Sequence, residues 1–389
     1  MNILLVSSIA PRGIYGSSRL LRETVEYLTM RGHRVEVLTY AADGEERVPI
    51  DAAHAYVVYG IASRRLPGIS SLAMWARLVR LSLTRRYDLV LCGVAYPSAI
   101  LAGAARVVTH CPYAVYLHGE DVTQVGGARL KTALLARALR GARLIMANST
   151  FTRQRIAALG IPAGKIALVH PWVDPSRFAT VSSGIVDSLR ARLGLDGAHV
   201  VLTVAHLDAR KGQDTVIRAL GAVRQRIPTV RYVIAGKGDQ ARLRALAAAE
   251  GVDNLVVFAN YLSDDELAAL YHLSQVYVMV SRWDPVTRYV EGFGIVYLEA
   301  AAAGLPAIAG SAGGCPDAVA DGATGLLVDP TSVRETAEAL CALLIDRERA
   351  AALGEAGRRR VEASFTKETQ LEYLAGLVTA AIAQGRTEP

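Results

Sequence analysis

Short apolar runs alternate with longer stretches of helical periodicity along the whole chain, and this alternation constrains the fold more than any other feature of the sequence. The first five runs fall at residues 3–6, 35–39, 89–92, 114–117 and 144–147. Five more follow at residues 200–205, 232–236, 255–258, 276–280 and 307–310. Runs that are apolar throughout are typical of parallel strands buried on both faces. Strand and helix in alternation, twice over, predict an α/β chain with two doubly wound, Rossmann-like sheets.

The 389 residues suffice for two domains of ordinary size. We place the boundary between residues 172 and 173, in a segment where Pro171 and Pro175 interrupt any regular element. The N-terminal domain is thus predicted to span residues 1–172, and the C-terminal domain residues 173–365. Because open α/β sheets bind ligands at the carboxyl ends of their strands, we expect the chemistry in the loops that follow strands, in a central cleft between the two sheets.

Composition excludes several classes of protein. Apolar residues make up 52% of the chain and charged residues 20%, which rules out disordered, collagen-like and disulfide-stapled chains. The four cysteines stand singly, without a C-x-x-C pair, so we expect a reduced, cytoplasmic protein without a structural zinc. No uncharged apolar stretch reaches the length of about 18 residues that a membrane-spanning helix needs.

Charge is distributed unevenly. Residues 1–180 contain 22 Lys and Arg against 11 Asp and Glu, whereas the remainder contains 21 against 25. Such asymmetry is typical of a half that faces phosphate, acidic lipid or nucleic acid, and a solubilising surface accounts for it equally well. Aromatic residues are only 6% of the chain and no stacking platform is apparent, which argues against nucleic acid as the partner.

Residues 70–86 are predicted to form a basic helix that bears Leu72, Trp75 and Leu83 among Arg77 and Arg80. Such a helix suits the surface of an anionic membrane. An amphipathic helix packed on its own sheet has the same spacing. The sequence leaves both interpretations open.

Two loops in the first half carry candidate binding groups. Gly16 lies in the loop 11–18 at a helix start, where free N–H groups favour an anion, although a capped turn is an ordinary alternative. His118 ends a strand beside Glu120 and Asp121, and these side chains suit a hydroxylated substrate or acid–base chemistry. For Asp121, capping of the next helix is the favoured interpretation.

The loops of the second half are richer in such groups. His206 ends a strand, and Arg210 and Lys211 precede the next helix together with a glycine, a combination that suits phosphate. Gly236 lies in a further glycine turn, where a planar base can approach the backbone closely.

Residues 291–300 form the most informative segment. Glu291 and Glu299 flank glycines that keep the loop bare, so that amides at the helix start can meet a diphosphate. One carboxylate can hold sugar hydroxyls while the other reaches a ribose.

Taken in order, these motifs resemble those of the retaining glycosyltransferases of family 4, whose fold is called GT-B. The resemblance covers nearly the whole chain and is carried by Gly16, by residues 118–121, 210–214, 303–306 and 313–317, and by the Glu-x7-Glu pattern of Glu291 and Glu299. Around residues 210–214 and 294–300 the sequence is most similar to bacterial mannosyltransferases that use GDP-mannose, including those that act on phosphatidylinositol mannosides.

The resemblance implies a hexosyltransferase that moves a hexose, mannose being favoured, from a nucleotide-diphosphate sugar to a hydroxyl acceptor with retention of configuration. A GDP-sugar is favoured over a UDP-sugar, and neither a metal nor another cofactor is expected. The N-terminal domain would bind the acceptor, a lipid-linked one being favoured, at the inner face of the cell membrane. The C-terminal domain would bind the donor, and a last helix over 366–389 would cross back to the first domain.

The resemblance also assigns roles to individual residues. It implies that Lys211 and Gly16 contact the diphosphate, that Glu291 holds the donor sugar and that Glu299 holds the ribose. His118 would face the sugar near the reacting carbon. Backbone amides would bind the sugar hydroxyls and the phosphate at Phe293, Gly294 and Ile295.

Some positions depart from the family pattern. His206 stands where the family has arginine, which predicts weaker or pH-dependent donor binding. Asp317 replaces a glutamate, Tyr15 replaces a glycine, and the stretch 281–290 is longer than in many members. An epimerase or sugar phosphorylase of the same architecture, or a nucleic-acid-binding protein, would be the alternative, but neither of these accounts for two glutamates around bare glycines.

Overall fold

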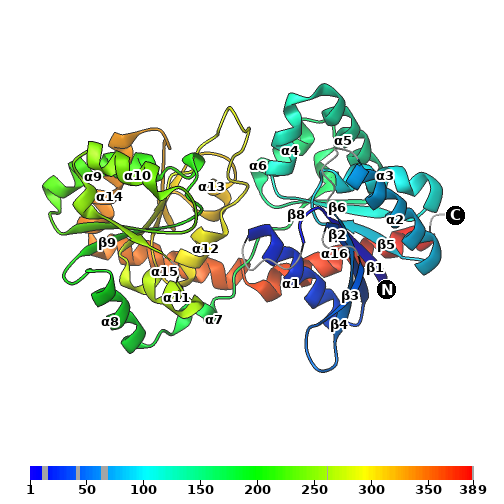
Figure 1. The fold of residues 1–389 in the computed structure, drawn as a ribbon, viewed down its shortest axis with the longest axis horizontal. Coiled ribbons are helices and arrows are strands. Elements are labelled where there is room, and N and C mark those ends of the chain that lie inside the picture. The colour runs from blue at the N-terminus through cyan, green and yellow to red at the C-terminus, as the bar shows by residue number, and fades with distance from the viewer. Residues whose placement is uncertain (11–15, 41–43, 63–68, 261, 388–389) are drawn as a thin grey trace. The chain divides into compact units, whose positions relative to one another are not determined.

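The computed structural model describes residues 1–10, 16–40, 44–62, 69–260 and 262–387. The chain forms two compact units, one of Met1–Pro171 with Glu368–Pro389 and the other of Trp172–Lys367. Each unit is built on one β-sheet with helices on both faces (Figure 1). The two predicted doubly wound sheets are therefore confirmed.

The first unit contains an eight-stranded sheet in the order β3-β4-β2-β1-β5-β6-β7-β8. Its pairs are parallel except β3 with β4, which is antiparallel. The strands are β1 (Asn2–Ser7), β2 (Arg34–Tyr40), β3 (Gly44–Pro49), β4 (Ala55–Ile61), β5 (Leu89–Cys92), β6 (Tyr113–Leu117), β7 (Leu144–Ala147) and β8 (Ile166–Leu168).

Helices cover both faces of this sheet because each carries one apolar stripe. One core joins the sheet to helices that follow β4, β5, β6 and β7, and the other joins it to the first and last helices of the chain. The helices on the first face are α2 (Ile69–Arg85), α3 (Ser98–Thr109), α5 (Arg129–Gly141) and α6 (Thr150–Ala157). Those on the opposite face are α1 (Gly16–Met30) and α16 (Lys367–Thr387), and the short α4 (Glu120–Thr123) follows β6.

Neither strand of the hairpin formed by β3 and β4 was predicted from the sequence. Strand β3 lies at the sheet edge, and its residues, GEERVP, are almost all exposed. Charged residues protect an exposed edge from pairing with other chains. Since such a strand has no apolar run, a search for buried strands passes over it.

The second unit contains a six-stranded, fully parallel sheet in the order β11-β10-β9-β12-β13-β14. The strands are β9 (His199–Val204), β10 (Val230–Ala235), β11 (Val256–Ala259), β12 (Val276–Met279), β13 (Ala307–Gly310) and β14 (Gly325–Val328). The helices are α7 (Ser176–Ala179), α8 (Ser183–Arg192), α9 (Gln213–Arg226), α10 (Gln240–Ala249), α11 (Asp264–Leu273), α12 (Ile295–Ala302), α13 (Cys315–Ala318), α14 (Val333–Ile345) and α15 (Arg347–Ser364).

Helix α15 crosses close to the turn after α12 because it carries two glycines on the contact face. A Cβ at Gly354 would lie 2.0 Å from the carbonyl oxygen of Gly304, and one at Gly357 would lie 3.2 Å from the Cβ of Ala301. Backbone carbonyls cannot move aside as a flexible side chain can, so this contact admits no larger residue without a shift of one of the helices.

We therefore expect Gly354→Ala to destabilise the protein by about 2 kcal/mol, because the added methyl overpacks a backbone contact. The control is Gly221→Ala in α9, where nothing lies within 4 Å of the new Cβ. That change should stabilise by roughly 0.5–1 kcal/mol, since alanine is the better helix former. Chemical denaturation of the two variants measures the difference, and equal effects would contradict the packing argument.

Candidate functional site

Neighbouring loops at the carboxyl edge of the second sheet touch through their backbones, and a glycine stands at each contact. A Cβ at Gly236, after β10, would lie 1.9 Å from the carbonyl oxygen of Ala205, after β9. The same holds for Gly212 against Val280 O at 2.3 Å, Gly310 against Ser281 O at 2.3 Å, and Gly313 against Glu291 O at 2.3 Å. The glycines therefore fix the positions of the loops relative to one another.

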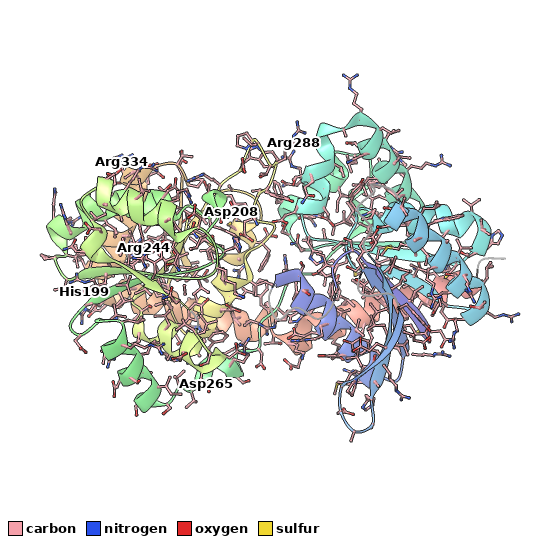
Figure 2. The ribbon with its side chains drawn as sticks, in the orientation of Figure 1. His199, Asp208, Arg244, Asp265, Arg288 and Arg334 are labelled. Atoms are coloured by element: carbon pink, nitrogen blue, oxygen red, sulfur yellow. The ribbon has the colours of Figure 1, made fainter. Side chains whose placement is uncertain are left out.

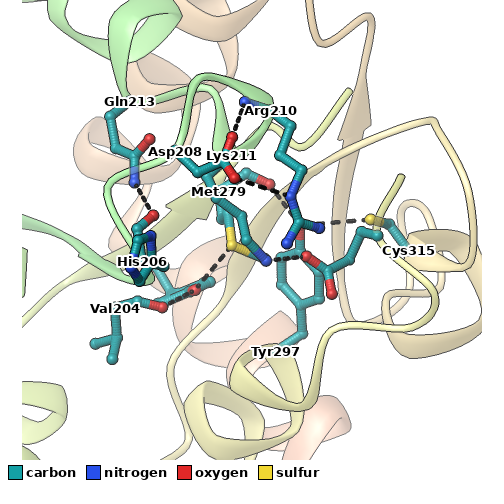
Figure 3. Close-up of polar contacts among 11 residues, drawn as sticks. Val204, His206, Asp208, Arg210, Lys211, Gln213, Met279, Tyr297 and Cys315 are labelled. Atoms are coloured by element: carbon teal, nitrogen blue, oxygen red, sulfur yellow. Dashed lines mark hydrogen bonds and ion pairs between the residues drawn. The ribbon is translucent and has the colours of Figure 1, made fainter. Parts of the chain in front are cut away.

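The first of these loops holds two cations before α9. The Asp208 carboxylate accepts a hydrogen bond from the backbone N–H of Arg210 at 3.0 Å and pairs with the Arg210 guanidinium at 3.2 Å. Gly212 adopts a left-handed φ of 77° and starts the helix. The Gln213 amide donates to the carbonyl of His206 at 3.0 Å, which closes the loop (Figure 3). Arg210 and Lys211 thus lie in a turn that is held in place by these hydrogen bonds.

Lys211 forms an ion pair with Glu291, which follows β12. The two side chains retain only 13% and 15% of their exposure. Burial alone would raise the pKa of Glu291, but the charges of Lys211 and Arg210 outweigh it and hold that pKa below its usual value. The carboxylate is therefore ionised at neutral pH and acts as a hydrogen-bond acceptor.

In the loop before α12 that was expected to be bare, residues 292–294 are buried. Gly294 caps the helix with a left-handed φ of 93°, and a Cβ there would lie 2.5 Å from the ring of Tyr297. The side chain of Phe293 turns into the core and packs against Phe365 at a ring-centroid distance of 5.8 Å. The backbone amide of Ile295 lies at the helix start, where an anion is favoured.

Glu299, about one turn after the start of α12, accepts a hydrogen bond from the hydroxyl of Tyr271 at 3.0 Å. Tyr271 belongs to a row of buried tyrosines that continues through Tyr277 and Tyr297. These tyrosines were not predicted as site residues, because their spacing in the sequence is that of ordinary core residues. Only the contact between α11 and α12 distinguishes Tyr271.

Two further predicted residues belong to the same edge. The His206 side chain is exposed at the end of β9. Gly236 follows β10, and the contact with Ala205 gives it a packing role besides the predicted approach of a base.

The longer stretch 281–290 contacts the loop that carries Arg210 and Lys211. Arg282 binds the Asp214 carboxylate at 2.9 Å, and its backbone N–H donates to the carbonyl of Arg210 at 2.8 Å. The Arg210 guanidinium lies 5.4 Å from the centre of the Tyr289 ring. Arg288, exposed near the tip, is labelled in Figure 2. The stretch is therefore an ordered part of the edge that carries Lys211.

In the first unit, the predicted group at the end of β6 is held by backbone contacts. His118 Nε2 lies 3.0 Å from the carbonyl oxygen of Gly93. This contact is a hydrogen bond when Nε2 carries the ring proton, and in that tautomer Nδ1 is a hydrogen-bond acceptor. Burial lowers the pKa of His118, although Asp121 and the Gly93 carbonyl oppose this effect. The imidazole is therefore neutral at pH 7 and suits a hydroxyl contact.

Asp121 is not the cap of a helix, so that interpretation was wrong. It lies inside the first turn of α4, and its carboxylate accepts from the backbone N–H of Ala95 at 2.8 Å and of His118 at 3.1 Å. These bonds tie the loop after β5 to the loop after β6.

Asn148, which contacts His118, and His170, which contacts Asn148, were not predicted as site residues. Asn148, directly after β7, donates from its amide to the carbonyl of His118 at 3.0 Å, and its own carbonyl accepts from the His170 ring at 3.1 Å. Both residues end strands or follow them, so the rule that selected His118 also applied to Asn148. Gly16 starts α1 with a φ of 58° and no atom within 4 Å of a built Cβ, and the rest of its loop, 11–15, lies outside the described residues.

Among the described residues, no group of three or more His, Cys, Asp and Glu is arranged to hold a metal ion.

Two family models match the chain. The model described as Glycosyltransferase Family 4 matches residues 14–177, and that described as Glycosyl transferases group 1 matches residues 186–360. The GDP-mannose-dependent alpha-(1-6)-phosphatidylinositol monomannoside mannosyltransferase of Mycobacterium tuberculosis is 36% identical over 380 residues, which cover 96% of this chain and 97% of the relative. A Corynebacterium glutamicum mannosyltransferase that acts on a monoacylated phosphatidylinositol monomannoside is 30% identical with the same coverage.

Solved structures agree with the fold. The crystal structure of Anabaena HepE in complex with UDP has a TM-score of 0.80 at 22% identity, with 98% of this chain and all of that chain covered. Sucrose-phosphate synthase from Thermosynechococcus elongatus has a TM-score of 0.81. The fold is GT-B, and the chain belongs to the family 4 and group 1 glycosyltransferases and is a hexosyltransferase, as the resemblance implied.

The ion pair yields a test of the site. We expect Lys211→Ala to weaken nucleotide-diphosphate binding by about 2 kcal/mol, or about 30-fold, because it removes a charged contact and leaves the Glu291 carboxylate facing the diphosphate. Glu291→Gln is the matched variant: it should leave nucleotide affinity within about threefold of wild type while lowering transfer. Calorimetric titration with GDP and a transfer assay measure both, and unchanged affinity in Lys211→Ala would contradict its role.

Proposed function

We propose that the protein transfers mannose from GDP-mannose to a hydroxyl group of a phosphatidylinositol mannoside, with retention of configuration. The observation that carries the proposal is the group of Lys211, Glu291 and Glu299 at one sheet edge, in a chain 36% identical to a mannosyltransferase of that specificity. The acceptor hydroxyl forms a bond to the anomeric carbon while the bond from that carbon to the phosphate oxygen breaks. GDP leaves, and its phosphate takes up the acceptor proton.

Each charged group has a part in this scheme. Lys211 and Arg210, with the amides of Phe293, Gly294 and Ile295, neutralise the negative charge that develops on the leaving diphosphate, which is the work that a metal ion does in other transferases. Glu291 accepts hydrogen bonds from sugar hydroxyls. Its pairing with Lys211 lowers its nucleophilicity, which favours attack on the front side of the sugar over a covalent intermediate.

The remaining predicted contacts complete the proposal. Glu299 holds the ribose, and Gly236 lies beside the base. His206 supplies a further contact to the phosphates. In the first unit, Gly16 contacts the diphosphate through its backbone, and the neutral His118 accepts a hydroxyl of the sugar through Nδ1.

A lipid-linked acceptor is supported by the surface of the first unit. Helices α2, α3 and α5 form one layer, and their sequences contain eight Arg and Lys but no Asp or Glu. Seven large apolar side chains of this α2–α3–α5 surface are exposed, namely Ile69, Leu72, Leu83, Val107, Val108, Leu130 and Leu134. Cations mixed with exposed apolar residues are suited to an anionic bilayer.

The two interpretations of the basic helix thus concern different faces of α2. Met74, Leu78 and Leu81 pack on the sheet, whereas Leu72 and Leu83 are 65% and 54% exposed. None of the described helices combines the length and apolar character that crossing a bilayer requires. We propose that the α2–α3–α5 surface brings the protein to the cytoplasmic face of the cell membrane, where anionic lipid would meet its cations.

Donor preference tests the reaction. Titration with GDP, UDP, ADP and TDP should give the tightest binding for GDP, and GDP-mannose with a phosphatidylinositol mannoside should give a product that is heavier by one hexose in mass spectrometry. NMR of the product should show the α-anomer that retention requires. Tightest binding of UDP would exclude GDP-mannose as the donor while leaving the transferase class intact.

Vesicle binding tests the membrane contact separately. Arg80→Glu with Arg137→Glu should lower co-sedimentation with vesicles rich in phosphatidylinositol at least tenfold, since each basic residue near an anionic surface contributes about 1 kcal/mol. Arg349→Glu with Arg359→Glu, two exposed positions on α15, makes the same charge change in the other unit and should leave binding unchanged. Equal loss in both double variants would show a net-charge effect and contradict a defined surface.

A further inference from the structure

The Glu299 carboxylate is hydrogen-bonded to the first of three buried tyrosines that contact one another in a row. Tyr271, Tyr277 and Tyr297 follow one another at ring-centroid distances of 6.0 and 5.7 Å, the first pair stacked and the second edge-on. All three rings are almost fully buried. Their hydroxyls have different partners, and this difference assigns them different tasks.

Only one of the three hydroxyls binds a carboxylate in the described contacts. The Tyr277 hydroxyl donates to the carbonyl of Val204 at 3.2 Å, and the Tyr297 hydroxyl donates to the carbonyl of Met279. Those two bonds connect the tyrosines to the ends of β9 and β12. The Tyr271 hydroxyl instead donates to Glu299 Oε2 at 3.0 Å.

Tyr271 is itself held firmly in place. The ring of Phe178, on α7, meets the Tyr271 ring edge-on at 5.4 Å, and the Tyr277 ring stacks with it at 6.0 Å. Helix α7 is tied to α11 on both sides of that contact: His272 Nε2 lies 2.7 Å from the carbonyl oxygen of Phe178, and Arg177 pairs with Asp264 at 3.1 Å. A ring that packs against two aromatic neighbours, on a helix held by these two contacts, directs its hydroxyl to one point.

The state of the hydroxyl suits a permanent donor. Burial, together with the neighbouring Glu299 charge, raises the pKa of Tyr271 well above its ordinary value, so that the phenol stays protonated. A hydrogen bond to a carboxylate is stronger and more directional than one between neutral groups. A carboxylate has about four acceptor positions, so the bond from Tyr271 is compatible with further bonds to a ligand.

We propose that Tyr271 is a positioning residue for the nucleotide ribose, which fixes the plane of the Glu299 carboxylate so that this carboxylate meets the ribose hydroxyls. This inference rests on the proposed function, in which Glu299 holds the ribose. Tyr271 acts through Glu299 and contacts no substrate atom. It adds to the family pattern a residue outside the Glu-x7-Glu segment.

The experiment compares GDP with 2′,3′-dideoxy-GDP, which lacks the hydroxyls that Glu299 would bind. Wild type should bind GDP much more tightly than the dideoxy analogue. Tyr271→Phe should weaken GDP binding about tenfold and binding of the analogue by less than about twofold, so that the ratio of the two affinities collapses. A role in stability alone would weaken both ligands equally and leave the ratio unchanged.

Tyr232→Phe is the matched control. It removes a buried tyrosine hydroxyl from the same unit, one that lies 2.8 Å from the Thr203 hydroxyl in a different part of the core. The control should keep the wild-type ratio of affinities. A ratio that falls equally in both variants would overturn the inference.

Glu299→Gln tests the role of Glu299 in ribose binding separately from the role of Tyr271. If that variant keeps the wild-type ratio, Glu299 does not hold the ribose, and this part of the proposed function fails together with the inference. If the ratio collapses in Glu299→Gln but persists in Tyr271→Phe, only the inference fails. The double variant Tyr271→Phe with Glu299→Gln should match Glu299→Gln alone, and it also serves if the single Phe variant does not fold, because it leaves no carboxylate without its donor.

Discussion

The pairing of Lys211 with Glu291 depends on β9 and β12 lying side by side in the second sheet. The two residues are separated by 80 positions in the chain, and each follows one of these strands. In a parallel sheet the carboxyl ends of all strands meet at one edge, so loops of neighbouring strands become neighbours regardless of their separation. A largely buried ion pair contributes little to stability, because desolvation offsets its attraction. We therefore interpret Lys211 and Glu291 as charged groups that are positioned to bind a ligand.

Close packing of backbones keeps that edge rigid. Gly236, Gly212, Gly310 and Gly313 each lie where a side chain would meet a carbonyl oxygen of the next loop. Glycine at such contacts loses more entropy on folding than other residues do, and the loss is offset by loops that approach within van der Waals distance. The cations, the helix start and both glutamates are consequently held on closely packed loops. This rigidity is what allows one tyrosine hydroxyl to direct one carboxylate.

The two units use different chemistry at their sheet edges. In the first, His118, Asp121 and Asn148 join three successive loops through hydrogen bonds to backbone groups, and the imidazole is neutral. In the second, charged side chains dominate, and the positive charges of Lys211 and Arg210 keep Glu291 ionised. A neutral acceptor suits uncharged hydroxyls, whereas a cationic loop suits a diphosphate.

The sequence by itself determined the two sheets and the loops that carry the site, because apolar runs and helical periodicity are local properties. It also selected Lys211, Glu291 and Glu299, since glycines and charged residues after strands are visible in one dimension. It could not find the edge strand β3, which lacks an apolar run, nor the task of Asp121, which binds amides of two loops. Tyr271 has the sequence signature of a core residue, and only the tertiary structure brings its hydroxyl to Glu299. Contacts between residues far apart in the chain were decided by tertiary structure, because they depend on strand order and helix packing, which no local pattern encodes.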